Sequence, residues 1–324
     1  MVRPIIVWIK EIYYPVLTAF GVPANLMTII ILSKGNCGLS KCISVYMMAM
    51  TTANLLVTIF NIMVYHIFTY HFPQSFLSYT AVCKLIVYVN CTTLDMSVWF
   101  TVSFTFDRFV AICSQKYKTK YCAVKTAATV LTTVSVLIYL EDIPFLFAFE
   151  HAGMVDNVHR GCRSSVAFFL SPAGAAYSWL QSVLIAWLPF ALILLFNGLT
   201  VRYISIAGRV RRKLRCNNTE NQKDPETDSR RKSIILLFTV SGSFILLWLT
   251  AAVSFLVNRV TNTVHYGDDH GKLAYIAAES GYMLMHLNSC TNACIYAATQ
   301  TKFREELKKL AKSPYTFILK LDKN

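Results

Sequence analysis

Few residues within the long apolar stretches of this sequence could do chemistry. They include Asp95, the adjacent pair Asp107 and Arg108, and His286. Ionisable side chains inside a membrane are costly and therefore mark functional positions. No enzymatic pattern surrounds them, because the sequence lacks a His-Glu-x-x-His zinc run, a Gly-x-Ser-x-Gly turn and a phosphate-binding loop. We expect a protein that is not an enzyme and holds no metal or cofactor, in which such groups bind each other or a ligand.

Seven apolar stretches must position these groups, and each is about long enough to cross a bilayer. The hydrocarbon layer is about 30 Å thick and needs ~20 residues of helix, and a helix satisfies its backbone polar groups internally. At a mean hydropathy of +0.47, the chain has too little polar surface to cover seven such segments in a soluble fold. We predict an all-α membrane protein, a seven-transmembrane helix bundle. The predicted spans are residues 12–32, 43–68, 81–113, 123–148, 174–205, 232–258 and 273–298.

The positions of Lys and Arg orient this bundle. If residues 1–11 lie outside the cell, 24 of the 31 Lys and Arg residues fall on the inner side. Cytoplasmic loops collect these residues, so we expect an extracellular N-terminus, a cytoplasmic C-terminus and a multi-pass protein of the plasma membrane. The net charge of +14 does not indicate a nucleic-acid partner, because the basic residues sit in short loops beside the spans. The longest polar stretch, residues 209–231, is predicted to be a flexible cytoplasmic linker.

A short amphipathic surface helix is predicted directly after the seventh span, over residues 301–311. Phe303, Leu307 and Leu310 recur at i, i+4 and i+7, and basic residues lie mostly off that stripe. Such a helix can lie on the anionic membrane lipids of the inner leaflet. The alternative is a helix surrounded by water. Residues 312–324 would form the cytoplasmic tail.

Two of the ten cysteines lie on the outer face in this topology. Cys83 opens the third span, and Cys162 lies in the loop between the fourth and fifth spans. Because the exterior is oxidising, we expect these two cysteines to form a disulfide; the alternative is two free thiols. The bridge would hold the long loop over the top of the bundle.

Polar and aromatic residues recur at defined places along the spans. They are Asn25 after Gly21-Val22-Pro23-Ala24, Asn54 in the second span, Asp107 and Arg108 closing the third, Pro189 in the fifth, Phe244 and Trp248 on one face of the sixth, and Asn292 and Tyr296 closing the seventh. Together with Cys83, these motifs resemble the rhodopsin-like (class A) family of G-protein-coupled receptors over residues 12–311. The Gly-x-Pro-Ala-Asn opening and the proline-free Asn-x-x-x-Tyr ending are similar to the orphan branch that includes receptors responding to aromatic amino acids.

The resemblance implies a switch at the inner end of the bundle. Arg108 would meet a heterotrimeric G protein when the sixth span swings out, and Asp107 would hold Arg108 at rest. The alternative is an interfacial arginine that extends its head group to water. Tyr296, in the motif that begins at Asn292, would move inward on activation.

The resemblance also implies a route from the outer half of the bundle to this switch. Trp248 would form the floor of a ligand pocket with Phe244 one turn below, although an ordinary aromatic core pair is the alternative. Pro189 would kink the fifth span, and Asn25 would bond the second and seventh spans. Asn54 stands where the family usually has Asp, so we do not expect the bundle to hold sodium.

Three departures from the family pattern concern signalling. The usual prolines of the sixth and seventh spans are replaced by Thr250 and Ala293. An acid often pairs with the switch arginine at the base of the sixth span, but here Arg230 and Arg231 occupy that end. We therefore expect weak restraint of the resting state and measurable basal signalling.

The resemblance places the ligand pocket in the outer half of the bundle. Besides Trp248, its wall residues would be Asn90, Cys91, Leu94, Gln181, Ile185, Ala252, Phe255, Tyr282 and His286. Asn90 stands where a receptor for simple amines would have a carboxylate, and no lysine between Lys272 and Lys302 could bind retinal. We expect an uncharged or zwitterionic small molecule, or the end of a short peptide.

The role of the carboxylates stays open at this point. Asp95 could contact the ligand or make structural hydrogen bonds with the fourth and fifth spans. Glu141, Asp142 and Glu279 are expected near the outer surface, either solvated, paired with loops or capturing the ligand.

The favoured function is a receptor with its ligand outside and a heterotrimeric G protein inside. A chemosensory receptor of the same fold and a non-signalling, receptor-like partner protein are alternatives. An ion- or proton-translocating bundle is the least favoured, because it needs a relay of carboxylates and only Asp95 is expected deep among the spans.

Overall fold

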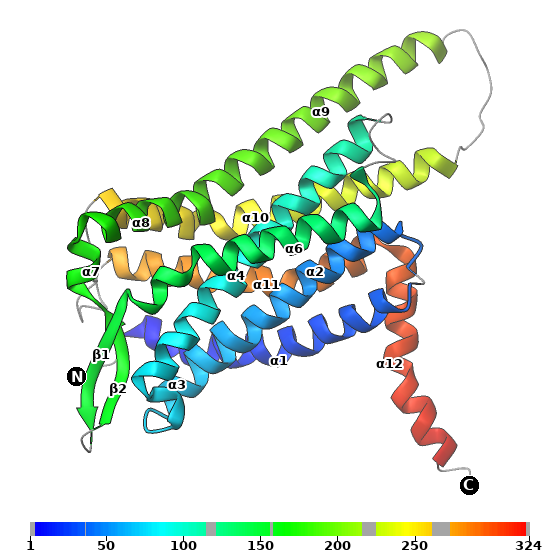
Figure 1. Cartoon of the computed structure of the whole chain (residues 1–324). Helices are drawn as coiled ribbons and strands as arrows, with labels where there is room; N and C mark the ends of the chain where they lie inside the picture. Colours follow the sequence, from blue (N-terminus) through cyan, green and yellow to red (C-terminus); the bar gives the residue numbers. More distant parts are fainter. Residues whose placement is uncertain are drawn as a thin grey trace.

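The computed structural model describes residues 4–35, 37–114, 121–155, 158–215, 225–260 and 273–321. Long helices run side by side and confirm the predicted seven-transmembrane helix bundle (Figure 1). The spans are α1 (Ile5–Ser33); α2 (Lys41–Val57) with the π-helix η1 (Thr58–Phe68) and α3 (Thr69–His71); α4 (Thr80–Cys113); α6 (Val124–Glu141) with the 3-10 turn η3 (Ile143–Leu146); α8 (Pro172–Ser182) with the π-helix η4 (Val183–Trp187) and α9 (Leu188–Arg215); α10 (Pro225–Val260); and α11 (Leu273–Thr299). Shorter elements are η2 (Phe76–Ser78) and α7 (Val166–Leu170), and α12 (Thr301–Leu321) follows the last span.

Six of these spans are long and apolar enough to cross a membrane, within the residues described. The seventh, α11, is more polar, but its polar residues turn into the bundle. His286, Asn288, Ser289 and Asn292 are each at most 3% exposed. Polar side chains that face a bundle interior are compatible with a membrane span, so α11 can lie in the bilayer beside the other six.

The first span starts at Ile5, earlier than the sequence predicted. Lys10 and Glu11 interrupt the apolar pattern, but both have partners on other helices. Lys10 Nζ lies 2.6 Å from Glu279 Oε2 of α11, and Tyr70 Oη donates a hydrogen bond to Glu11 Oε1 at 2.8 Å. The predicted extracellular segment is thus mostly the first turns of α1, and its first three residues lie outside the described part.

The fifth and sixth spans extend as helices beyond their predicted inner ends. α9 continues to Arg215 and α10 starts at Pro225, so the stretch predicted as a flexible linker is helical on both flanks. Arg, Lys and Glu, which are common there, have high helix propensity. Residues 216–224 between the two helices lie outside the described part.

The amphipathic helix after the seventh span is longer than predicted and packs differently. α12 runs to Leu321, and its apolar stripe contacts the inner end of the bundle rather than lipid alone. Phe303 is 1% exposed, and its ring centroid lies 6.1 Å from that of Tyr296 in α11. Leu307 and Leu310 pack against the same core. Because α12 begins two residues after the end of α11, its apolar residues lie beside the core of the bundle.

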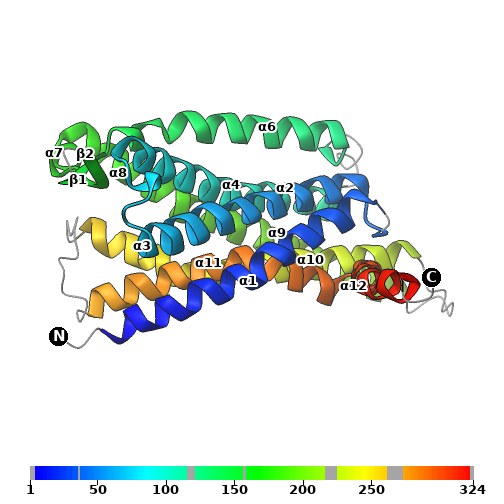
Figure 2. The same cartoon turned by 90° about the horizontal axis from the view of Figure 1, so that it is seen from below.

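The two ends of the bundle differ in what they carry. The start of α1 lies at the same end as a β-hairpin, whereas α12 and the C-terminus lie at the opposite end (Figures 1 and 2). Termini at opposite ends agree with an odd number of spans. α6 runs along one edge of the bundle, in contact with α4 and α2 (Figure 2).

The β-hairpin lies between the fourth and fifth spans. Strand β1 (Phe149–Val155) pairs antiparallel with β2 (Val158–Ser164), and Phe149 stands opposite Ser164. The sequence analysis predicted only a long loop here, because the polar residues of these strands do not alternate with apolar ones in the way that indicates a half-buried strand.

Two glycines let α11 approach its neighbours closely. A Cβ atom on Gly21 of α1 would collide with Cys290 Sγ of α11. A Cβ atom on Gly281 of α11 would lie 2.8 Å from the backbone nitrogen of Ala251 in α10. Small residues at such crossings bring helix backbones together in membranes, so α11 is held tightly between α1 and α10.

Candidate functional site

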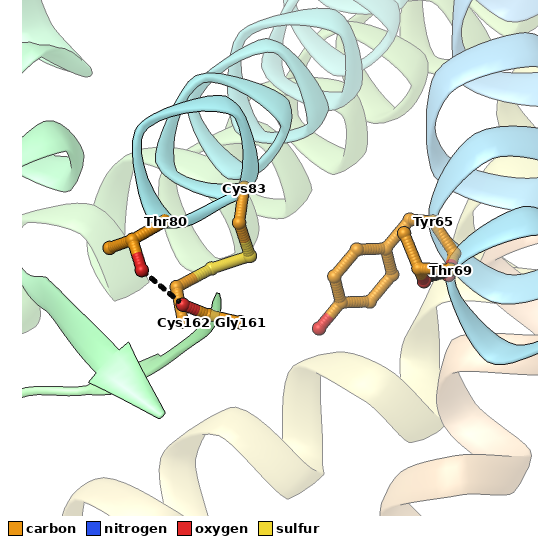
Figure 3. Close-up of a disulfide and its surroundings, with 6 residues drawn as sticks. All are labelled: Tyr65, Thr69, Thr80, Cys83, Gly161 and Cys162. Atoms are coloured by element: carbon orange, nitrogen blue, oxygen red, sulfur yellow. Dashed lines mark hydrogen bonds between the residues drawn. A yellow bond between two sulfur atoms is a disulfide. The ribbon is translucent and has the colours of Figure 1, made fainter. Parts of the chain in front are cut away.

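A disulfide fastens the β-hairpin to the outer end of α4. Cys83 and Cys162 are bonded, with Cα atoms 5.9 Å apart (Figure 3), which confirms the predicted pairing. Beside the bridge, Thr80 Oγ1 donates a hydrogen bond to Gly161 O at 2.9 Å. The ring of Tyr65, from the second span, points toward the bridge (Figure 3). The hairpin is thereby held over the outer end of the bundle.

An arginine–carboxylate pair lies buried at the inner end of α4. Arg108 and Asp107 are each 3% exposed, and Arg108 Nε donates to Asp107 Oδ2 at 2.9 Å. Cys42 Sγ of α2 donates to Asp107 Oδ1 at 3.3 Å, and Arg108 Nη1 donates to Ser233 Oγ of α10 at 3.3 Å. The pair therefore links three helices, and Arg108 does not extend to the surface.

The end of the seventh span lies in the same inner region. Asn292 is 3% exposed, and Tyr296 is fully buried. Tyr296 belongs to one buried apolar cluster with Met47 of α2, Phe104 of α4 and Leu236 of α10. Side chains from four spans thus meet around the residue that the resemblance assigns to the switch.

Aromatic rings connect the fifth and sixth spans at mid-depth. Trp248 and Phe244 stack one turn apart in α10, with ring centroids 5.3 Å apart, and Phe190 of α9 lies 5.8 Å from Phe244. Pro189 precedes Phe190, and the π-helix η4 ends at Trp187 just before it. Proline has no N–H to donate to the preceding turn, and the wider turns of a π-helix occur at such irregular places.

Two buried asparagines make hydrogen bonds between spans. Asn25 Nδ2 donates to Gly21 O at 2.9 Å and to Ser289 O of α11 at 3.0 Å. No hydrogen bond from Asn25 to the second span is present among the described residues, so only the seventh-span part of its expected role has a counterpart. Asn54 Oδ1 of α2 accepts a hydrogen bond from Ser97 Oγ of α4 at 2.6 Å.

Sodium is expected to leave agonist binding unchanged in this protein. Asn54 is fully buried and engaged with Ser97, and a neutral amide supplies no negative charge to hold a cation. The measurement is agonist affinity in membranes with sodium chloride or with a sodium-free salt of equal ionic strength. Asn54→Asp is the matched variant and should gain a sodium effect. A clear sodium shift in the wild-type protein would refute this prediction.

Six of the residues predicted to line the pocket gather in one largely apolar cluster. They are Leu94, Ile185, Trp248, Ala252, Phe255 and Tyr282. Among the described residues, four polar atoms of the predicted pocket residues are buried without a hydrogen-bond partner: Asn90 Oδ1, Gln181 Oε1, Trp248 Nε1 and His286 Nδ1. Because buried polar groups are normally paired, these atoms are suited to bind polar groups of a ligand.

Two other predicted pocket residues, His286 and Asn90, make contacts with the second span. His286 faces the first and second spans, where its ring centroid is 5.7 Å from that of Tyr14 and 5.3 Å from that of His66. Asn90 is close to the second span, because Asn61 Nδ2 donates to its backbone oxygen at 3.2 Å. Helical periodicity places these residues along their helices but does not give the rotation of each helix in the bundle.

A cavity of about 490 Å³ opens beside His66, between α1, the outer half of the second span and α11. None of the predicted pocket residues lines it. The sequence analysis missed it because residues 1–11 were expected to lie outside the bundle, as an extracellular N-terminus. Its polar lining includes Lys10, Glu11, Tyr14, Tyr65, His66 and Glu279.

Three carboxylates gather where α4 meets the outer end of α6. One oxygen from each of Asp95, Glu141 and Asp142 lies within 4.8 Å of the others. Gln181 Nε2 of α8 donates to Asp95 Oδ2 at 3.2 Å and to Asp142 Oδ1 at 2.9 Å. Asp95 therefore faces the fourth and fifth spans.

Of the roles left open for Asp142, the solvated one does not fit the structure. Asp142 is fully buried, and Glu141 beside it is partly buried. Both residues stand at the end of a predicted span, where sequence alone favours solvation. Gln181 comes from a different span, and no sequence signal connects it to them.

The comparison with protein families agrees with this geometry. The family described as "7 transmembrane receptor (rhodopsin family)" matches residues 24–296, from within α1 to Tyr296 of α11. Most of the multi-pass bundle is thus covered by the match, including the Asp107–Arg108 pair. Proteins of this kind are generally signalling receptors rather than enzymes. The chain belongs to the rhodopsin family of 7 transmembrane receptors.

Proposed function

We propose that this protein is a G-protein-coupled receptor of the plasma membrane with an extracellular N-terminus. It binds an extracellular small molecule or short peptide and activates a heterotrimeric G protein inside the cell. The observation that carries the proposal is the buried Asp107–Arg108 pair, which is bonded to Ser233 of α10. Outward movement of α10 would break the bond to Ser233 and leave Arg108 free to contact the G protein.

The buried polar atoms of the outer half support a ligand with both donors and acceptors. Asn90 Oδ1 and Gln181 Oε1 accept, Trp248 Nε1 donates, and all three are unpaired among the described residues. Aromatic neighbours such as Phe255 and Tyr282, 5.8 Å apart between ring centroids, suit a flat apolar group. We therefore propose the aromatic amino acids and short peptides that contain them as first candidates. A chemosensory role of this receptor would differ only in the source of the ligand.

The test is a second-messenger measurement in cells that express the full chain, screened with amino acids and short peptides. We expect at least one ligand to evoke a second-messenger response. The Arg108→Ala variant should lose this response at an equal amount of receptor at the cell surface. A ligand that binds without any response through Gs, Gi or Gq readouts would favour the non-signalling alternative.

Basal signalling should be measurable and should fall in Ser233→Glu. Arg108 donates to the neutral Ser233 hydroxyl, and Arg231 near it is exposed. A glutamate at position 233 would offer Arg108 a charge-assisted bond, which is roughly twice as strong as a neutral one. The measurement is ligand-free second-messenger level against surface amount, with Ser233→Ala as control. A silent wild-type receptor at high surface amount would contradict the prediction.

A further inference from the structure

A second cavity lies at the edge of the bundle, outside the predicted pocket. Its volume is about 370 Å³, and it is bounded by α4, α6 and η4. Leu137 on its rim is 60% exposed in a helix that spans the membrane, so the cavity reaches the surface that would contact lipid. The lining consists of the apolar residues Trp99, Val134, Leu137, Ile138 and Leu184 and of two acids, Asp95 and Glu141.

The two acids at this cavity have carboxylate oxygens without hydrogen-bond donors. Asp95 Oδ1 and Glu141 Oε1 receive no hydrogen bond from the described residues, and neither does Asp142 Oδ2 next to them. Asp95 is 2% exposed, so water does not satisfy it at the surface. The amide of Gln181 donates to the other oxygens of Asp95 and Asp142 but carries no charge. Carboxyl groups gathered this closely in a low dielectric either take up protons or bind a positive partner.

We propose that this cavity binds a membrane-soluble ligand with a cationic amine head and an apolar body. An ammonium group carries three N–H donors and no acceptor, so it can donate to both lining carboxylates at once in charge-assisted hydrogen bonds. The apolar walls take up the hydrocarbon part, whose burial is favourable. A bare divalent cation would satisfy the acids but leave those walls without a partner.

The cavity is chemically distinct from the predicted pocket, whose wall has Asn90 where an acid would attract an amine. Gln181, which was predicted to line that pocket, lies next to the cavity, because its amide donates a hydrogen bond to Asp95. The proposed amine site does not rest on the proposed signalling function, because binding can be measured on the protein alone.

The experiment measures the Tm of the purified full chain in lipid nanodiscs with increasing dodecylamine, and with dodecanol as the neutral control. We expect a saturable rise in Tm with the amine and none with the alcohol. Glu141→Gln and Asp95→Asn should each raise the half-saturating amine concentration about tenfold, because each removes a charge-assisted bond but keeps the side-chain shape. Glu150→Gln is the matched control, since Glu150 is an acid of β1 that pairs with Arg163 at 3.0 Å, and it should respond as the wild type does.

A size variant separates this proposal from a folding defect. Leu137→Trp fills the rim of the cavity without changing its charge, and its exposed position spares the core, so it should fold and lose the response to the amine. Equal Tm shifts with amine and alcohol would overturn the proposal. The proposal would also be overturned if Glu141→Gln and Asp95→Asn had the same half-saturating amine concentration as the wild type. A Tm rise with calcium chloride that these variants abolish, in the absence of an amine effect, would assign the acids to a metal ion instead.

Discussion

Arg108→Ala is expected to abolish both basal and ligand-evoked second-messenger signalling. The variant removes the group that we propose contacts the G protein and leaves Asp107 buried without its cationic partner. Breaking a buried ion pair by removing one member destabilises a protein by about 3–5 kcal/mol. Cys42 Sγ would then be the remaining donor to Asp107 in the described structure, and a thiol is a weak donor. The measurement is second-messenger level normalised to the amount of receptor at the cell surface.

Two further variants separate signalling from folding at this position. Arg108→Lys keeps the positive charge but loses the planar guanidinium. Compared with Arg108→Ala, it should therefore raise the amount of receptor at the cell surface more than it raises signalling. Arg202→Ala, an exposed inner arginine of α9, is the matched control and should signal as the wild type does. An Arg108→Ala receptor that signals normally at equal surface amount would refute the proposed role of this residue.

Loss of the Cys83–Cys162 disulfide is expected to remove most receptor from the cell surface. Disulfides contribute about 2–5 kcal/mol to small extracellular folds, and this one closes a separation of 79 residues. Without it, the hairpin keeps weaker contacts with the rest of the outer end. They include the hydrogen bonds of Thr80 with Gly161 and of Arg160 with Gln74, and the Arg160 guanidinium over the Tyr79 ring. The measurements are surface labelling in intact cells and the Tm of Cys83→Ser against the wild type.

A free cysteine offers the matched control for this experiment. Cys294 is an exposed thiol of α11, and Cys294→Ser should leave surface amount and Tm unchanged. Reducing agent should lower the Tm of the wild type toward that of Cys83→Ser and leave the variant unaffected. Equal Tm values for the wild type and Cys83→Ser would show that the hairpin does not need the bridge.

The spans and the Asp107–Arg108 pair were predictable from sequence because both depend on local patterns. A long apolar stretch predicts a membrane helix. Asp107 and Arg108 are adjacent in the sequence, so they lie close together however their helix is rotated in the bundle. The start of α1 was missed because Lys10 and Glu11 break the apolar pattern, and their partners come from distant parts of the chain.

The candidate pocket was predictable only in part, because it depends on how each helix is rotated. Leu94, Phe255 and four other predicted pocket residues gather in one cluster. His286 faces the first two spans instead, where it meets Tyr14 and His66. The role of Asp142 stayed open because its hydrogen bond with Gln181 joins two spans, and no local pattern encodes such a contact.

The π-helix η1 allows side chains in the outer half of the second span to change their direction around the helix axis. Successive residues of an α-helix differ by about 100° around the axis, and a wide π turn holds one residue more than an α turn. Converting one such turn to α geometry would therefore swivel the following side chains by roughly that angle. Tyr65 and His66 both lie in this segment and line the 490 Å³ cavity. A shift of one residue in η1 would thus turn the Tyr65 phenol and the His66 imidazole relative to that cavity, while α2 before it keeps its α-helical geometry.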